Sequence, residues 1–178
     1  MGRKRTLRKF IAALALAVLI VWPVYNIYGY LQPQGRAADA ARLLYQVALF
    51  QMELLNNSLA ESSKARTASG LNSLRLAAYS ANFAHERLVL AYGEDRLAKL
   101  HSVEKLLQYV LRVQIGGERA VRAEEQETLA MASEQFAAIY EVYGKLLHSS
   151  GKPSSSADGE LRKLDKQLSE LLEKRLMP

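Results

Sequence analysis

The chain has 178 residues, of which 49% are hydrophobic, and a formal net charge of +6. This length suits one ordinary domain with short additions, and this hydrophobic content excludes a chain that is disordered throughout. There is no cysteine, which excludes disulfides and thiolate metal sites. Five of the 24 lysines and arginines lie in the first nine residues, so from residue 10 onward 19 basic residues face all 18 acidic residues. A nucleic-acid-binding domain needs a basic face, and we therefore expect no nucleic-acid partner.

An uncharged segment of 22 residues, 10–31, follows a basic stub over residues 1–9. About 20 apolar residues in a helix cross the hydrocarbon core of a bilayer, so we predict a transmembrane helix here. Its second half carries aromatic residues typical of a membrane interface, namely Trp22, Tyr25, Tyr28 and Tyr30. The basic residues of the stub are Arg3, Lys4, Arg5, Arg8 and Lys9. By the positive-inside rule they predict a single-pass protein of the cell membrane, with a cytoplasmic N-terminus and an extracytoplasmic C-terminal domain.

Two other interpretations of residues 10–31 compete with the anchor. A cleaved signal peptide shares the basic start and apolar core, but cleavage needs small residues shortly after that core. The region there is aromatic and bulky, and its best candidate cleavage site, residues 35–37 (Gly-Arg-Ala), is a poor one. A buried core helix of a cytosolic protein is disfavoured by the length and the charged flank.

The rest of the chain is typical of an all-α protein. Proline is absent from residue 34 to residue 152, and apolar residues recur at intervals of three and four, the helical period. This pattern predicts helices at about 37–62, 71–92, 95–115 and 118–147. Short connections at Gly93 and at residues 116–117 make neighbouring helices antiparallel. We therefore predict an up-down-up-down four-helix bundle over residues 36–148.

Each predicted helix carries an apolar stripe that we expect to pack against the other helices. In the first helix the stripe consists of Leu43, Val47, Phe50 and Leu54, and Leu44, Leu55 and Leu59 widen it. In the second helix it consists of Leu71, Leu74, Ala78, Ala81, His85, Leu88 and Tyr92. In the third it includes Leu100, Val103, Leu107 and Val110, and in the fourth Leu129, Ala132, Phe136, Ile139, Tyr143 and Leu146.

Serine and glycine dominate residues 149–159, a composition that predicts a flexible linker. A short amphipathic helix follows at residues 160–178, with leucines at heptad spacing: Leu161, Leu164, Leu168 and Leu171. Two to three heptads are marginal as a coiled coil alone. The helix therefore docks on its own bundle, pairs with another chain or frays. We predict that its leucine face binds a partner protein or a second copy.

No catalytic or cofactor motif is visible, and we expect no enzyme activity, no cofactor and no metal site. The pair His101 and Glu104 shares a helical face, which is a common surface feature and a weak metal motif. His85 lies on an apolar stripe, which predicts a half-buried histidine bonded to a neighbouring helix; the alternative is a pH-sensitive switch. Five tyrosines either belong to the core or line a ligand cleft, namely Tyr45, Tyr79, Tyr109, Tyr140 and Tyr143.

Several short motifs resemble a known family. They are Tyr-Gly-Tyr at residues 28–30 after the predicted span, Leu-Tyr at 44–45 and Asn-Ser-Leu-Ala at 57–60 in the first helix, and Leu-Arg-Leu at 74–76 in the second. With the basic stub and the single span, they resemble the N-terminal part of the spore-germination membrane protein that accompanies a cortex-lytic enzyme in spore-forming bacteria. The resemblance covers roughly residues 10–148, and the chain lacks the large C-terminal domains of that family. It implies a non-catalytic partner that positions another protein at the spore membrane.

Two functions follow from these observations. The favoured hypothesis is a membrane-anchored, non-catalytic helical interaction or scaffold protein that binds another membrane or envelope protein in a sporulation, germination or cell-envelope complex. The alternative is an extracytoplasmic, sensor-like bundle that binds a small molecule and acts through a partner, or a secreted version of it after signal cleavage.

Overall fold

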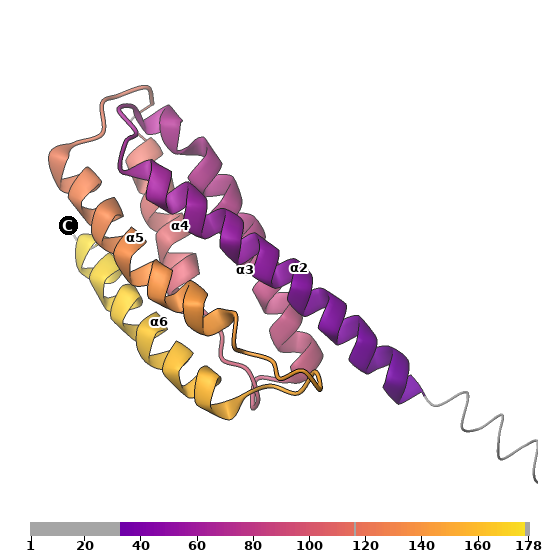
Figure 1. Ribbon diagram of the computed structural model, residues 1–178. Coiled ribbons are helices and arrows are strands. Elements are labelled where there is room, and N and C mark those ends of the chain that lie inside the picture. Colours follow the sequence, from indigo (N-terminus) through magenta and orange to yellow (C-terminus); the bar gives the residue numbers. More distant parts are fainter. Residues whose placement is uncertain (1–32, 116, 177–178) are drawn as a thin grey trace, which may run out of the picture. The chain divides into compact units, whose positions relative to one another are not determined.

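The computed structural model describes residues 33–115 and 117–176 (Figure 1). The predicted membrane segment 10–31, its basic stub and its aromatic residues lie outside these ranges. The chain divides into two compact units, Met1–Ala38 and Asp39–Pro178, and the second unit holds the bundle described below. Among the described helices, none combines the length and the hydropathy that crossing a bilayer requires.

Within the described ranges the fold is all-α, as predicted, and contains no strand. The elements are α2 (Pro33–Ser62), the 3-10 helix η1 (Ala68–Leu71), α3 (Asn72–Tyr92), α4 (His101–Gln114), α5 (Ala123–Tyr143) and α6 (Ser155–Leu176). Successive helices of the bundle alternate in direction (Figure 1). The expected stripes of the second and fourth helices are confirmed, since nearly all of their side chains are buried.

All five helices contribute to one hydrophobic core, which differs from the predicted four-helix bundle with an appended helix. Leu161, Leu168 and Leu172 of α6 are fully buried in the same core as the side chains of α2 to α5. Helix α6 lies parallel to α4: Asp165 meets the first residues of α4, and Arg112 near the end of α4 reaches the last turn of α6. Of the three arrangements considered for the C-terminal helix, the structure has the docked one.

Two connections are longer than predicted, because tertiary contacts replace helical hydrogen bonds there. Residues 95–100 are not helical, and α4 begins at His101. Residues 118–122 run alongside the segment before η1, where the Ala68 N–H donates to the Arg119 carbonyl at 2.9 Å. The Val121 N–H donates to the Arg66 carbonyl at 3.0 Å. These bonds hold the chain extended up to Arg122, so α5 begins only at Ala123.

The predicted linker at residues 149–159 is a closed turn followed by the first residues of α6. The His148 N–H donates to the Lys152 carbonyl at 2.9 Å, and Gly151 has a positive φ of 79°, which glycine adopts without strain. The Ser154 carbonyl accepts from the Asp158 N–H at 2.9 Å, and its hydroxyl accepts from the Ala157 N–H. Serine is a favoured residue for such capping, so the helix begins at Ser155 despite the linker-like composition.

Candidate functional site

The most unusual surface of the bundle is the apolar stripe of α2, which faces solvent instead of the core. Leu43 is 62% exposed and Phe50 is 54% exposed, and Val47 and Leu54 are also exposed. The expectation that these four residues pack against the other helices is therefore wrong for the described bundle, whereas Leu55 and Leu59, which were expected to widen the stripe, are buried. The side of α2 that does face the core carries Tyr45, Ala48, Met52, Leu55 and Leu59.

The reason is that α2 is apolar on two sides, and helical periodicity alone does not say which side is buried. The buried side includes Ala48, which is fully buried, and Tyr45. The Tyr45 hydroxyl donates to the Tyr143 carbonyl at 2.8 Å, and the two rings stack with centroids 6.1 Å apart. This polar contact with a distant part of the sequence fixes the orientation of α2.

The exposed stripe of α2 follows a strict 4-3-4 spacing from Leu43 to Leu54. That spacing is the a/d pattern of a coiled-coil seam, which is narrower than the stripe of an ordinary surface helix. Among the flanking residues Gln46, Gln51 and Ser58 are polar and uncharged, and Glu53 is acidic. A row of four large apolar side chains at this spacing is suited to packing against one further helix.

Helix α3 exposes a second apolar row, made of Leu76, Tyr79, Phe83 and Leu90. All four are half exposed or more, and the guanidinium of Arg87 lies 4.8 Å from the centroid of the Phe83 ring. Scattered exposed apolar residues are normal on a soluble surface, whereas contiguous ones mark interaction sites. Two consecutive helices of this chain thus carry rows of that kind.

His85 is buried in the core and is held by two hydrogen bonds. Its Nε2 lies 2.8 Å from the Ala98 carbonyl and its Nδ1 lies 3.0 Å from the Tyr143 hydroxyl. Because a carbonyl only accepts, Nε2 carries the hydrogen and Nδ1 accepts from Tyr143. Burial lowers the pKa of His85 below its ordinary value, against a smaller opposing effect of the Ala98 carbonyl. The prediction of a histidine bonded to a neighbouring part of the bundle is confirmed, although its burial is complete rather than partial.

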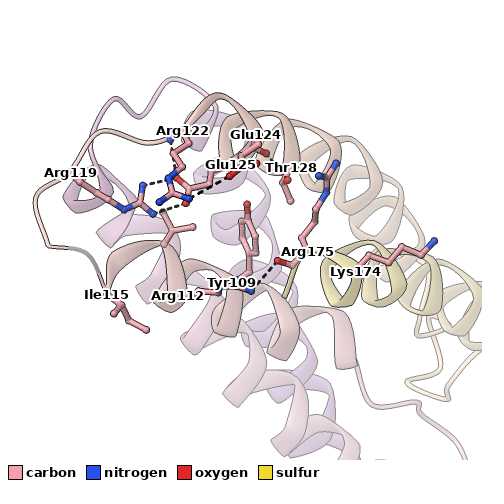
Figure 2. Close-up of a pocket in the computed structure, with 11 residues that line it drawn as sticks. Tyr109, Arg112, Ile115, Arg119, Arg122, Glu124, Glu125, Thr128, Lys174 and Arg175 are labelled. Atoms are coloured by element: carbon pink, nitrogen blue, oxygen red, sulfur yellow. Dashed lines mark hydrogen bonds and ion pairs between the residues drawn. The ribbon is translucent and has the colours of Figure 1, made fainter. Parts of the chain in front are cut away.

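A cavity of about 600 Å³ is formed by α4, the connection to α5, the start of α5 and the end of α6. Figure 2 shows the side chains that line it. Its lining carries five basic side chains and two acidic ones: Arg112, Arg119, Arg122, Lys174 and Arg175, with Glu124 and Glu125. The side chains that line the cavity therefore carry a formal charge of +3.

Some of these basic groups are already engaged. Arg119 makes a bidentate pair with Glu125, with distances of 2.8 and 2.5 Å, and this arginine lowers the pKa of Glu125. Arg112 donates to the backbone carbonyls of Arg175 and Leu176 at the end of α6. Lys174 and Arg175 make no ion pair with another described residue. Basic residues are favourable near helix C-termini, and this accounts for part of the cluster.

The sequence-predicted site residues lie apart from these features. Leu161 and Leu168 are fully buried in the chain's own core, and Leu164 and Leu171 pack at its edge. The leucine face predicted for partner binding is therefore occupied by the bundle itself. His101 and Glu104 face solvent, and no group of three metal-ligating residues occurs within the ranges that the structure describes.

The tyrosines that were candidates for a ligand cleft divide into buried and exposed side chains. Tyr45, Tyr109 and Tyr143 are buried, whereas Tyr79 is exposed on the α3 row. The 4-3-4 spacing of α2 was visible in the sequence, but its exposure was not. No family model matches the sequence, and neither a curated protein nor a solved structure shows significant similarity to the chain.

Proposed function

We propose that this protein is a membrane-anchored, non-catalytic helical interaction protein, and that the exposed stripe of α2 is its binding surface. The observation that carries the proposal is the exposure of Leu43, Val47, Phe50 and Leu54 at coiled-coil spacing. Burying a large apolar side chain contributes about 1.5–3 kcal/mol, so a stripe of this size is a substantial source of binding free energy. Association with a helix is the simplest way to bury it.

The anchor rests on the sequence. Residues 10–31 have the length and the aromatic interface residues of a span, and the basic stub orients the bundle toward the outside. The resemblance to the germination protein family points to the same class of function, a protein that positions a partner at a membrane. Protease digestion of a C-terminal tag on intact cells tests the orientation: cleavage from outside is expected, and protection until lysis contradicts it.

A photo-crosslinking amino acid placed at Phe50 tests the binding surface in living cells. The matched control places it at Lys163, which is exposed on α6. We expect a covalent adduct of defined mass from position 50, absent from position 163 and lost when Val47→Asp is added. The proposal is contradicted if position 50 yields no adduct, or if both positions yield the same adducts.

The cavity of Figure 2 favours a second candidate function, the binding of a small anionic ligand. Lys174 and Arg175 line it without an ion-pair partner among the described residues, and Arg122 pairs only loosely with Glu124 at 3.6 Å. Pyrophosphate is a suitable probe, because guanidinium groups bind phosphate oxygens in pairs. A rise in melting temperature that exceeds that given by sodium chloride of equal ionic strength, and that is lost in Lys174→Ala/Arg175→Ala, supports this candidate.

A further inference from the structure

We propose that the α2 stripe binds the α2 stripe of a second copy of this chain, as a short parallel two-helix coiled coil. This inference rests on the proposed function, since it names the partner of the same surface. The seam consists of Ala40, Leu43, Val47, Phe50 and Leu54, all of which are exposed.

The order of side chains along the seam fits two strands. With Leu43 and Phe50 at the d positions, Val47 and Leu54 take the a positions. A β-branched residue at a with leucine at d favours a parallel dimer, and the pair Leu43 and Val47 has this arrangement. The self-complementary pattern means that one surface supplies both halves of the interface, as a twofold dimer requires.

The residues beside the seam are compatible with the parallel arrangement. In such a dimer each g residue faces the e residue of the next heptad in the other chain. Gln46 then faces Gln51 of the second copy, and Glu53 faces Ser58 of the second copy. No pair of like charges is brought together along this seam, so nothing in the flanks opposes the pairing.

The position of the stripe relative to the predicted anchor selects the parallel orientation. Helix α2 begins at Pro33, two residues after the predicted span ends at Leu31. Two copies anchored through residues 10–31 in one membrane leave it in the same chain direction, which favours the parallel arrangement. In the sequence, the single residue Gln32 separates the predicted span from α2, whereas hairpins between antiparallel helices use loops of about 2–5 residues. Residues 10–31 of the same chain are therefore a disfavoured occupant of the stripe.

The stripe is too short to hold two free chains together strongly. From Leu43 to Leu54 it spans 12 residues, or about 17 Å of helix, and two heptads form only a marginal coiled coil. Confinement to one membrane shifts the equilibrium between monomer and dimer toward the dimer, because tethered modules meet at a high effective concentration. The dimer is therefore expected in the membrane and is expected to dissociate when the full-length chain is diluted in detergent.

The absence of cysteine makes disulfide crosslinking in native membranes a sharp test. A disulfide requires Cα atoms within about 7 Å, so single-cysteine variants Leu43→Cys and Leu54→Cys form covalent dimers only if equivalent residues face each other. In an antiparallel dimer Leu43 faces Leu54 of the second copy, and neither variant links to itself. The controls are Arg42→Cys, exposed beside the seam, and Phe83→Cys on the α3 row. These substitutions replace exposed side chains, which limits their effect on folding.

We expect Leu43→Cys and Leu54→Cys to give at least several-fold more disulfide dimer than Arg42→Cys or Phe83→Cys after mild oxidation. The proposal is overturned if Arg42→Cys gives as much disulfide dimer as the seam variants, or if Phe83→Cys gives the most. It is also overturned if neither seam variant gives any dimer. The photo-crosslinker at Phe50 distinguishes failure of the proposed dimer from failure of the proposed interaction surface. An adduct with a different protein there, without seam disulfides, refutes the second copy but keeps the interaction surface; no adduct and no disulfide refute both.

Discussion

The carboxylate of Asp165 in α6 accepts a hydrogen bond of 2.8 Å from the backbone N–H of Ser102 in α4. The same carboxylate accepts from the His101 N–H at 3.1 Å, and Asp158, two turns earlier in α6, accepts from the Ala98 N–H at 2.7 Å. The first N–H groups of a helix have no partner within the helix. Two buried acidic side chains of α6 thus satisfy the start of α4 and the segment before it. Helix α6 therefore supplies buried hydrogen-bond acceptors to the bundle as well as apolar side chains to its core.

Replacing Asp165 with alanine is expected to destabilise the bundle. The change removes a cap at a buried helix start, which costs about 1–2 kcal/mol, and leaves the Ser102 N–H buried without a partner. A loss of about 2 kcal/mol lowers the melting temperature of a chain of this size by roughly 4–8 °C. Thermal unfolding followed by circular dichroism measures the change. Asp165→Asn keeps one acceptor oxygen and should lose less; equal losses in both variants contradict the capping role.

The part of the fold that depends on local pattern was predictable. Helix α3 was expected at 71–92 and lies at Asn72–Tyr92, because its buried stripe keeps the three- and four-residue spacing of a helix and Gly93 ends it with a positive φ of 97°. What the pattern did not contain are the long-range pairings. The start of α4 depends on Asp165, and the start of α5 on hydrogen bonds with the segment before η1. Acidic residues at 94 and 95 suggested an earlier start for α4, and nothing local opposed it.

The orientations of α2 and α6 were likewise beyond the sequence pattern. Helix α6 has leucines at heptad spacing, which suits a partner helix from any chain, and the bonds from Asp158 and Asp165 select its own bundle. Helix α2 has two apolar sides, and the contact of Tyr45 with Tyr143, 98 residues away, selects the buried one. In both helices a buried polar contact that periodicity does not detect selects the packing: in α6 it selects the chain's own bundle, and in α2 it selects the side that faces the core.

Two leucines of α6 test whether the helix is docked. Leu168 is fully buried and Leu164 lies at the edge of the core. Leu168→Ala is expected to cost about 2–5 kcal/mol, as for other fully buried leucines, and Leu164→Ala clearly less. Urea unfolding of both variants measures the difference. Similar small losses in both variants would mean that α6 is not held in the core.

The buried imidazole of His85 predicts an acid-sensitive stability. Burial holds its pKa below the ordinary value of 6.5, so in acid the unfolded chain binds a proton that the folded chain does not. This contribution to stability is fully present above pH 6.5 and is lost as the pH falls below it. In His85→Gln this loss should be absent, although the variant is less stable at neutral pH because its contacts with Ala98 and Tyr143 change.

The measurement for His85 is the free energy of unfolding between pH 7.5 and pH 5 in the parent chain and in His85→Gln. His101 and His148 are present in both chains and provide the background. We expect the parent chain to lose more stability over this range than the variant. Parallel curves for the two chains contradict the assignment of the acid sensitivity to His85.

Phe50 and Met52 provide the most direct comparison of the two sides of α2. Phe50 is 54% exposed, so Phe50→Ser should change the free energy of unfolding by no more than about 0.5 kcal/mol. Met52 is fully buried, and Met52→Ala should cost about 2–5 kcal/mol. If the order is reversed, the stripe faces the core and the interaction surface does not exist. Self-association in the membrane has a separate signature, because a dimer stabilises the folded chain by an amount that rises with the logarithm of its concentration. The parent chain in lipid vesicles should therefore unfold at a higher temperature at a higher protein-to-lipid ratio, and Phe50→Ser should unfold at the same temperature at both ratios.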